Sequence, residues 1–228
     1  LEELARALPL YGDVHLVRPG MVYLSDATET GGVYTLAELE SIARLCREHR
    51  MYLFVDGARL GCALTARGSD VTLPDLARLC DAFTVGGTKN GALMGEALVL
   101  ANPALHEDFF RIQKQRGGVL AKGWLIGAQF EALLSGGLYF DLARHANEMA
   151  QRLQEGLVRK GVPFLFPSPT NQIFPIVRDE DLPGLQALCP LEVWGPAEEP
   201  GHTIVRLVAC FATTPEEVDG LISAFPAP

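Results

Sequence analysis

The chain has 228 residues, of which 48% are hydrophobic, and a formal net charge of −9. This length predicts one large domain, or a domain with a smaller companion, and the apolar content is ample for a core. The negative charge argues against nucleic acid or an anionic membrane as a partner, and no apolar stretch reaches membrane-spanning length. The five cysteines lack C-x-x-C spacing, so we expect reduced thiols in a cytoplasmic protein and no metal site.

The first residues continue a pattern that begins outside the sequence. The chain opens on Leu1 without a methionine and midway through a helical pattern, so we expect the record of a longer protein with its N-terminal part missing. This helix is predicted to end near Leu8. His15 follows in a loop before a predicted strand, Met21 to Ser25, and a lone histidine in a loop is most often a surface or packing residue.

The next segments alternate between helical and strand patterns. Thr35 and Glu38 form a capping box, which predicts a helix to about Arg50, and a strand ends at Asp56. A second helix, Pro74 to Leu79, leads into a strand at 82–85, and residues 96–100 predict a return strand, antiparallel to its neighbour. Strands joined by helical crossovers predict an α/β fold with a doubly wound, mainly parallel sheet.

Two polar side chains follow neighbouring strands of this predicted sheet. Asp56 ends one apolar run, and Lys89 follows the other within Gly86-Gly87-Thr88-Lys89-Asn90-Gly91. Ligands of open α/β sheets bind outside the carboxyl ends of the strands. An acid and a lysine there suit pyridoxal 5′-phosphate (PLP), because the amine forms a Schiff base with the aldehyde and the acid faces the pyridinium nitrogen.

Each motif also has an ordinary structural explanation. An acid after a strand often only caps a loop, and Asn90-Gly91 could supply nothing more than the left-handed residues of a turn. It is the combination, with each motif placed after a predicted strand, that favours a site.

The C-terminal part changes character. Residues 104–160 carry long helical patterns, and from about Phe164 short strands alternate with predicted helices at 182–188 and 215–225. We therefore predict that residues 1–140 belong to a large domain and residues 141–228 form a smaller α+β domain. Arg206 lies within an otherwise apolar predicted strand, where it either extends to an edge or meets a specific anion.

Most of the chain resembles the threonine aldolases, the β-eliminating lyase branch of the fold-type I PLP enzymes. The resemblance rests on Asp56-Gly57-Ala58-Arg59, on the lysine turn Gly86 to Gly91 and on the return strand Gly95 to Val99. The form GGTKNG followed by GEALV is especially similar to the low-specificity L-threonine aldolases. The stretch from His15 to Thr28 and the segment 170–174 continue the similarity at both ends.

The resemblance implies roles for the residues of this central segment. Lys89 would be the PLP lysine, and Asp56 would bind the pyridinium nitrogen. Arg59 would contact both the substrate carboxylate and the edge of the cofactor, where its planar fork suits an anion. Thr88 would offer its hydroxyl, and Gly86 and Gly87 their amides, to the cofactor phosphate. The earlier phosphate-binding segment of the family has no counterpart in these residues.

Three further residues receive candidate roles from the same resemblance. His15 would assist proton removal from the substrate β-hydroxyl, a task that a water molecule could also perform. Arg206 would bind the substrate α-carboxylate. Lys122 lies two residues beyond the place where the family has an arginine that reaches the cofactor phosphate of a neighbouring subunit. If Lys122 performs this task, the protein is a homo-oligomer, a dimer or a tetramer, with shared active sites.

The implied function is PLP-dependent cleavage of L-threonine or L-allo-threonine to glycine and an aldehyde. Another PLP lyase or an aminotransferase on the same fold remains an alternative, because fold alone does not separate these reactions. An inactive truncated fragment is a second alternative. A nucleotide-binding or regulatory α/β module is a third, although the chain has neither G-x-G-x-x-G in its first βα turns nor a Walker-type loop.

Overall fold

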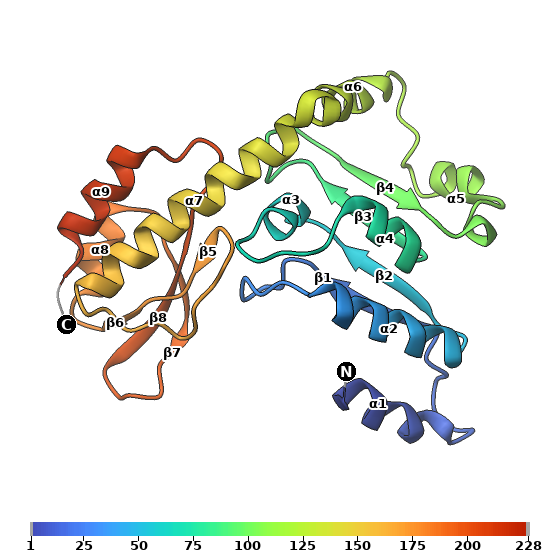
Figure 1. Cartoon of the computed structure of the whole chain (residues 1–228), viewed down its shortest axis with the longest axis horizontal. Coiled ribbons are helices and arrows are strands. Elements are labelled where there is room, and N and C mark those ends of the chain that lie inside the picture. The colour runs from blue at the N-terminus through green and yellow to red at the C-terminus, as the bar shows by residue number, and fades with distance from the viewer. Residues whose placement is uncertain (1, 227–228) are drawn as a thin grey trace. The chain divides into compact units, whose positions relative to one another are not determined.

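The structure is a computed structural model that describes residues 2–226 and contains two compact units (Figure 1). Within the described residues, unit 1 comprises 2–26, 34–60 and 69–135, and unit 2 comprises 27–33, 61–68 and 136–226. These units differ from the predicted domains mainly because two short segments, 27–33 and 61–68, group with the C-terminal part. The domain boundary at residue 140 stays a prediction.

Unit 1 is built on a four-stranded sheet. Its strands are β1 (Met21–Ser25), β2 (Tyr52–Asp56), β3 (Ala82–Gly86) and β4 (Glu96–Leu100), in the spatial order β1-β2-β3-β4. The first three strands are parallel, and β4 runs antiparallel to β3. The predicted α/β fold, its mainly parallel sheet and its antiparallel return strand are therefore confirmed.

Helices precede, connect and follow these strands, close to the sequence pattern. They are α1 (Glu2–Ala7), α2 (Leu36–Glu48), α3 (Leu60–Leu64), α4 (Leu73–Leu79), α5 (Phe109–Gln115) and α6 (Trp124–Leu134). Leu1, the predicted first residue of the opening helix, lies outside the described residues. Thr35 and Glu38 make both hydrogen bonds of the predicted capping box, and α2 buries Leu39, Ile42 and Cys46. Short helix α3 was not predicted.

Unit 2 packs three helices against a second sheet. Strand β8 (His202–Val208) pairs antiparallel with β5 (Gln172–Ile173), β6 (Ile176–Arg178) and β7 (Glu192–Pro196). The helices are α7 (Leu138–Arg159), α8 (Leu182–Leu188) and α9 (Pro215–Ala224). Alternation along β8 directs Val205 and Leu207 into a core with Leu153 and Leu157 of α7, and the intervening Arg206 belongs to the opposite face.

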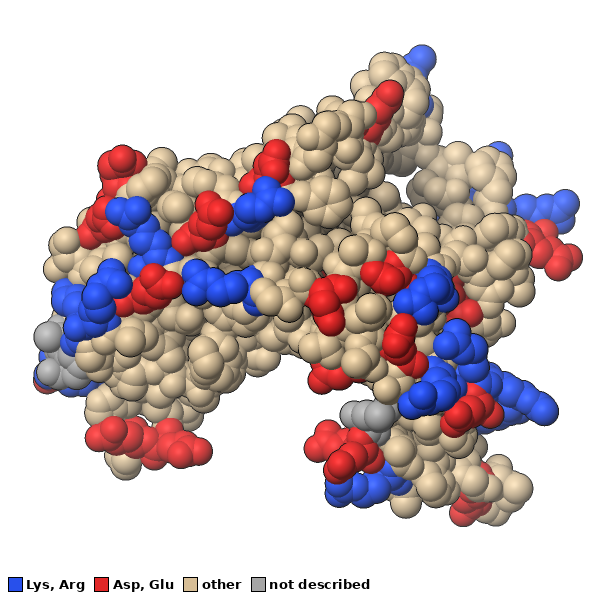
Figure 2. All heavy atoms as spheres, viewed as in Figure 1, with Lys and Arg blue, Asp and Glu red and all other residues tan. Residues whose placement is uncertain are grey.

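The outer side of α7 shows why this long helix is amphipathic. Exposed charges of alternating sign follow each other at helical spacing, namely Arg144, Glu148, Arg152, Glu155 and Arg159. Figure 2 shows this mixture of basic and acidic side chains on the viewed face.

Among residues 2–226, no helix combines the length and apolarity that a membrane span requires.

Hydrogen bonds explain why 27–33 and 61–68 belong to unit 2. The Thr170 hydroxyl donates to the carbonyl of Gly31 (3.0 Å). The Asn147 side chain donates to the carbonyl of Cys62 (2.9 Å) and to the Thr65 hydroxyl (3.1 Å). Both donors are buried, so loss of either would leave a polar group without water.

The loops that follow β2 and β3 are in direct backbone contact. The amide of Gly57 donates to the Thr84 hydroxyl (2.9 Å), and the amide of Gly86 donates to the Gly57 carbonyl (2.9 Å). A Cβ atom on Gly57 would lie 1.9 Å from the Thr84 carbonyl oxygen, and one on Gly86 would lie 2.5 Å from the carbonyl oxygen of Ala58. Only glycine permits this approach, because any side chain would force the two loops apart.

We therefore expect Gly57→Ala to destabilise the protein by roughly 1–3 kcal/mol or more, the range for overpacking a tight site. Urea denaturation would measure the change. Gly127→Ala is a matched control, because a Cβ atom on Gly127 meets no other atom within 4 Å and the residue lies inside helix α6. This control should be neutral or stabilising by up to about 1 kcal/mol. Equal stability of Gly57→Ala and the native protein would contradict the steric argument.

Candidate active site

Asp56 lies at the carboxyl end of β2 with its carboxylate held by two donors. The backbone amide of Ala58 donates to Asp56 Oδ1 (2.9 Å), and the Tyr23 hydroxyl donates to Asp56 Oδ2. Tyr23 comes from the neighbouring strand β1, where its ring stacks on Phe54 at 5.3 Å between centroids. The carboxylate is half-buried, and its two donors fix its direction. An acid that binds the pyridinium nitrogen of PLP would need such a fixed direction.

Lys89 lies in the exposed turn that follows β3. Among the described residues, no hydrogen bond or ion pair engages its amine, which is therefore available to a ligand. The loop around it is anchored from α6, since the Gln129 side chain accepts from the amide of Leu93 (2.8 Å) and donates to the carbonyl of Met94 (3.4 Å). The backbone of this turn is thus fixed while the lysine side chain is free.

Asp56 and Lys89 follow the same end of adjacent parallel strands, as the sequence predicted. The paired residues Phe54 with Ala82 and Val55 with Phe83 fix the register of β2 against β3. The glycine contact between Gly57 and Gly86 then holds the two following loops together. An acid and an amine are therefore presented at one sheet edge, where ligands of α/β folds bind.

The roles of two neighbours of this pair, Arg59 and Thr88, stay predictions, and the expectation for Gly86 is wrong. Arg59 is half-buried beyond Asp56, and Thr88 is exposed next to Lys89. The amide of Gly86, expected to bind a phosphate, instead donates to the Gly57 carbonyl. The close approach of the two loops has already satisfied that group, so it cannot also serve an anion in this arrangement.

Asp26 is a buried acid that the sequence did not single out. It follows β1 directly, is 2% exposed, and its amide donates to the carbonyl of Asp56 (2.9 Å). Burial raises the pKa of the Asp26 carboxyl to about 7, and a hydrogen bond to the backbone of Tyr34 partly offsets the rise. Asp26 Oδ1 has no partner among the described residues, as befits a group that favours its neutral form.

His15 and Lys122 are both exposed in unit 1. His15 belongs to the segment that leads into the amino-terminal end of β1, and its backbone amide donates to Asp13 Oδ1 (2.9 Å). Lys122 lies in the turn between α5 and α6, with a left-handed φ of 65°. Neither position tests the role that the resemblance implies, so both roles stay predictions.

Arg206 of unit 2 is surrounded by polar and aromatic groups. Its guanidinium contacts the carboxylate of Glu192 and donates to the Gln172 side chain (3.3 Å), with Glu29 at 3.9 Å. The Trp194 ring centroid lies 5.5 Å from the centre of the guanidinium. The strand arginine therefore meets specific anions, one of the two possibilities that the sequence left open.

Sequence reasoning missed Tyr23 and Glu192, although both are cross-strand neighbours of predicted residues. Tyr23 lies two residues before Ser25, the partner of Asp56 in the β1–β2 register. Glu192 is the direct partner of Arg206 in the β7–β8 register. Period-two alternation places such pairs on one face, but the signal is usable only once the strand pairing is known.

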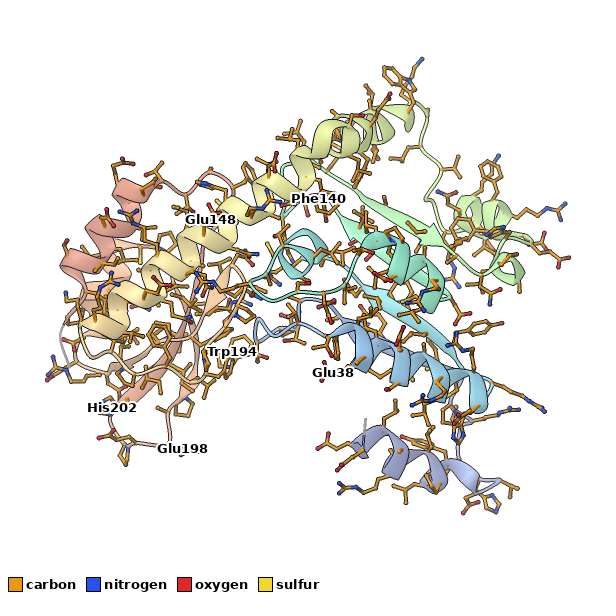
Figure 3. The ribbon with its side chains drawn as sticks, viewed as in Figure 1. Glu38, Phe140, Glu148, Trp194, Glu198 and His202 are labelled. Carbon is orange, nitrogen blue, oxygen red and sulfur yellow. The ribbon has the colours of Figure 1, made fainter. Side chains whose placement is uncertain are left out.

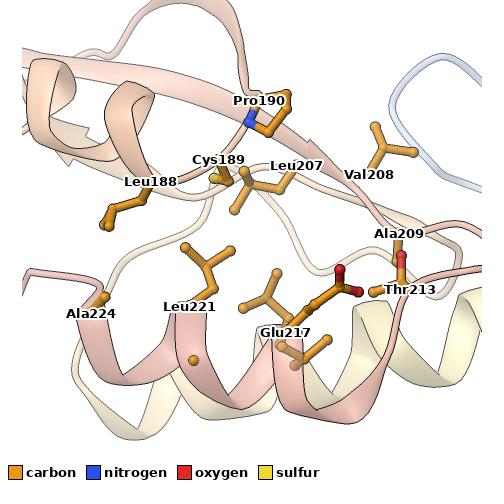
Figure 4. Close-up of a pocket in the computed structure, with 13 residues that line it drawn as sticks. Leu188, Cys189, Pro190, Leu207, Val208, Ala209, Thr213, Glu217, Leu221 and Ala224 are labelled. Atoms are coloured by element: carbon orange, nitrogen blue, oxygen red, sulfur yellow. The ribbon is translucent and has the colours of Figure 1, made fainter.

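A separate hollow of about 560 Å³ lies within unit 2 and is lined mainly by apolar residues of α7, α8, β8 and α9, with Thr213 and Glu217 also in its wall (Figure 4). Its walls include Leu153, Leu188, Leu207 and Leu221, and none of the predicted site residues lines it. This hollow therefore has no part in the chemistry considered for Asp56 and Lys89.

Comparison with known proteins identifies the family. The model of the beta-eliminating lyase family matches residues 1–180, so this chain belongs to that family. Over 177 residues the chain is 35% identical to a low specificity L-threonine aldolase of Pseudomonas sp. (strain NCIMB 10558), covering 77% of this chain and 50% of that protein. It is also 32% identical over 168 residues to alanine racemase TOXG of Cochliobolus carbonum, covering 71% of this chain and 42% of that protein.

Solved structures place the fold. A threonine aldolase from Leishmania major superposes with a TM-score of 0.94 at 41% identity, covering 97% of this chain and 65% of that one. Sphingomonas wittichii serine palmitoyltransferase superposes with a TM-score of 0.63 at 17% identity, covering 91% and 54% respectively, which is a likeness of fold alone. The fold is that of the fold-type I PLP enzymes, and the chain spans about half the length of the curated relatives it matches.

The raised pKa of Asp26 gives a prediction on stability and pH. The unfolded carboxyl ionises near 3.8 and the folded one near 7, so the folded state binds one more proton between these values. The contribution of Asp26 to the free energy of unfolding is therefore highest below pH 3.8. This contribution falls as the pH rises to about 7.

Asp26→Asn removes this titration. We expect the variant to gain stability relative to the native protein as the pH rises from 4 to 7, with no further gain above that. Urea denaturation across this pH range would measure the difference. Asp70→Asn is the control, since Asp70 is exposed on the surface and its substitution should not reproduce the trend. A difference that is constant with pH would contradict the assignment.

Proposed function

We propose that this chain forms part of a PLP-dependent aldehyde-lyase that cleaves L-threonine or L-allo-threonine to glycine and an aldehyde. The observation that carries the proposal is the fixed carboxylate of Asp56 and the unengaged amine of Lys89, which follow the carboxyl ends of adjacent parallel strands. Membership of the beta-eliminating lyase family and the identity to low specificity L-threonine aldolases support it.

The residues present fit PLP. Lys89 offers an unengaged primary amine, and Asp56 offers a carboxylate whose direction is set by Tyr23 and Ala58. Thr88 adds an exposed hydroxyl for the phosphate. When bound, PLP supplies an aldehyde that captures amines and a ring that accepts the electron pair released at the substrate α-carbon.

Each residue then has a defined task in the proposed reaction. Asp56 would hold a proton on the ring nitrogen, and Lys89 Nζ would bind the cofactor aldehyde. Arg59 and Arg206 bind the substrate carboxylate, which orients the bond between Cα and Cβ for cleavage. His15, or a water molecule, takes the proton from the β-hydroxyl as the aldehyde leaves.

The test is chemical labelling of Lys89. The purified protein, supplied with PLP, should absorb visible light, lose that band on borohydride reduction and carry a pyridoxyl group on Lys89 in peptide maps. Lys89→Ala should abolish both the label and threonine cleavage, because it removes the amine that would hold the cofactor. Lys114→Ala, an exposed lysine of α5, should retain both properties.

The products separate the proposed reaction from its alternatives. Glycine and an aldehyde from threonine support the aldol cleavage, whereas 2-oxobutanoate and ammonia would indicate elimination. Interconversion of alanine enantiomers would indicate a racemase, the activity named for the Cochliobolus relative. A protein that takes up no PLP would overturn the proposal as a whole.

We further propose that the protein is a homo-oligomer, a dimer or a tetramer, in which Lys122 reaches the cofactor phosphate of a neighbouring subunit. Large apolar side chains are exposed on α5, α6 and the adjoining loops, among them Leu93 (90%), Phe110 (64%), Leu120 (58%) and Trp124 (67%). So much exposed apolar surface is typical of a protein–protein interface.

The five free cysteines, three of them buried, support a reducing, cytoplasmic location.

Trp124→Glu tests the interface. Placing a charge within an apolar contact should lower the molecular mass measured by light scattering, because the buried carboxylate would lack a partner. Val158→Glu is the matched control, since Val158 is also exposed (57%) but lies on α7 of unit 2. It should leave the mass unchanged. An unchanged mass for Trp124→Glu as well would contradict the placement of the interface.

A further inference from the structure

Arg206 is held by acidic side chains of its own chain. Its Nη2 donates to the carboxylate of Glu192, its direct cross-strand partner on β7. Its Nη1 donates to the Gln172 side-chain oxygen (3.3 Å) and lies 3.9 Å from the carboxylate of Glu29. All four residues belong to unit 2.

The guanidinium is also shielded on one face. The ring of Trp194, which Figure 3 labels, lies 5.5 Å from the guanidinium carbon, a cation–π distance. Trp194 and Glu192 belong to the same strand, β7. The Arg206 side chain is only 17% exposed, and its Nε has no partner among the described residues. Tryptophan and burial thus fix the plane of the fork and leave few directions from which an anion can approach.

The charges of this cluster do not balance. One guanidinium faces two carboxylates, so the group as described carries a net charge of −1 before any ligand arrives. A ligand carboxylate that binds both terminal nitrogens of the fork would share Nη2 with Glu192, whose negative charge repels it. Since the Glu192 side chain is 54% exposed, it can move into water when a ligand replaces it.

We propose that Glu192 acts as an internal competitor for the carboxylate-binding face of Arg206, and thereby lowers the affinity of the site for amino-acid carboxylates. The inference rests on the proposed role of Arg206 in binding the substrate carboxylate. Glu29 makes a smaller contribution, because it lies farther from the fork and its side chain is 67% exposed. Glu192 is in this sense a specificity-determining residue, since its competition acts only against ligands that carry a carboxylate.

The experiment compares two ligands that differ in the competing group. Glycine carries a carboxylate, and glycinamide replaces it with a neutral amide. Both are titrated calorimetrically into the PLP-loaded protein and into its Glu192→Gln variant. Glu192→Gln should bind glycine about threefold to fivefold more tightly, the effect of removing one partly exposed ion pair, and should show no gain for glycinamide.

Glu198→Gln is the matched control, because it removes the same charge from the exposed loop between β7 and β8. It should leave glycine binding unchanged. Arg206→Gln separates the two proposals, since it should weaken glycine binding at least about tenfold if the arginine binds the carboxylate.

Loss of binding in Arg206→Gln with unchanged or weaker binding in Glu192→Gln would overturn the competition and leave the role of Arg206 intact. An equal gain for glycine and glycinamide in Glu192→Gln would also overturn it, because the effect would then not involve the carboxylate. Full binding by Arg206→Gln would remove the assigned role of the arginine, and the inference with it.

Discussion

The candidate site depends on the close contact between the backbones that follow β2 and β3. Gly57 and Gly86 allow the two loops to approach until the amide of one meets the carbonyl of the other. Asp56 precedes this contact directly, and Lys89 follows it by one short turn. The geometry of an acid and an amine is therefore set by main-chain hydrogen bonds rather than by the mobile side chains themselves.

Two charged groups of the proposed chemistry are held in opposite ways. Asp56 is bound by a backbone amide and a phenol, both neutral donors, so its negative charge remains available to a cation. Arg206 is bound by carboxylates, so its positive charge is already neutralised within the chain. A group held by neutral partners is ready for its ligand, whereas a group held by opposite charge must first give up a partner.

The fold presents the proposed site residues on two kinds of sheet. The parallel strands of unit 1 present their carboxyl ends to one edge, as ligand-binding α/β sheets do. Within unit 2, Arg206 lies in the middle of a strand whose alternate residues form an apolar core. Membership of the beta-eliminating lyase family links these features to one class of chemistry, while fold alone would permit several.

The sequence by itself determined the helices and strands, because hydrophobic periodicity and helix capping depend on residues close together in the chain. The capping box of α2 at Thr35 and the strand that ends at Asp56 are examples that need no tertiary contact. The motif around Lys89 was equally local. Only the tertiary structure decided that the Gly86 amide donates to the Gly57 carbonyl and that the Glu192 carboxylate accepts a hydrogen bond from Arg206. Such contacts join residues far apart in the chain, and strand register, which no local pattern specifies, selects which of them form.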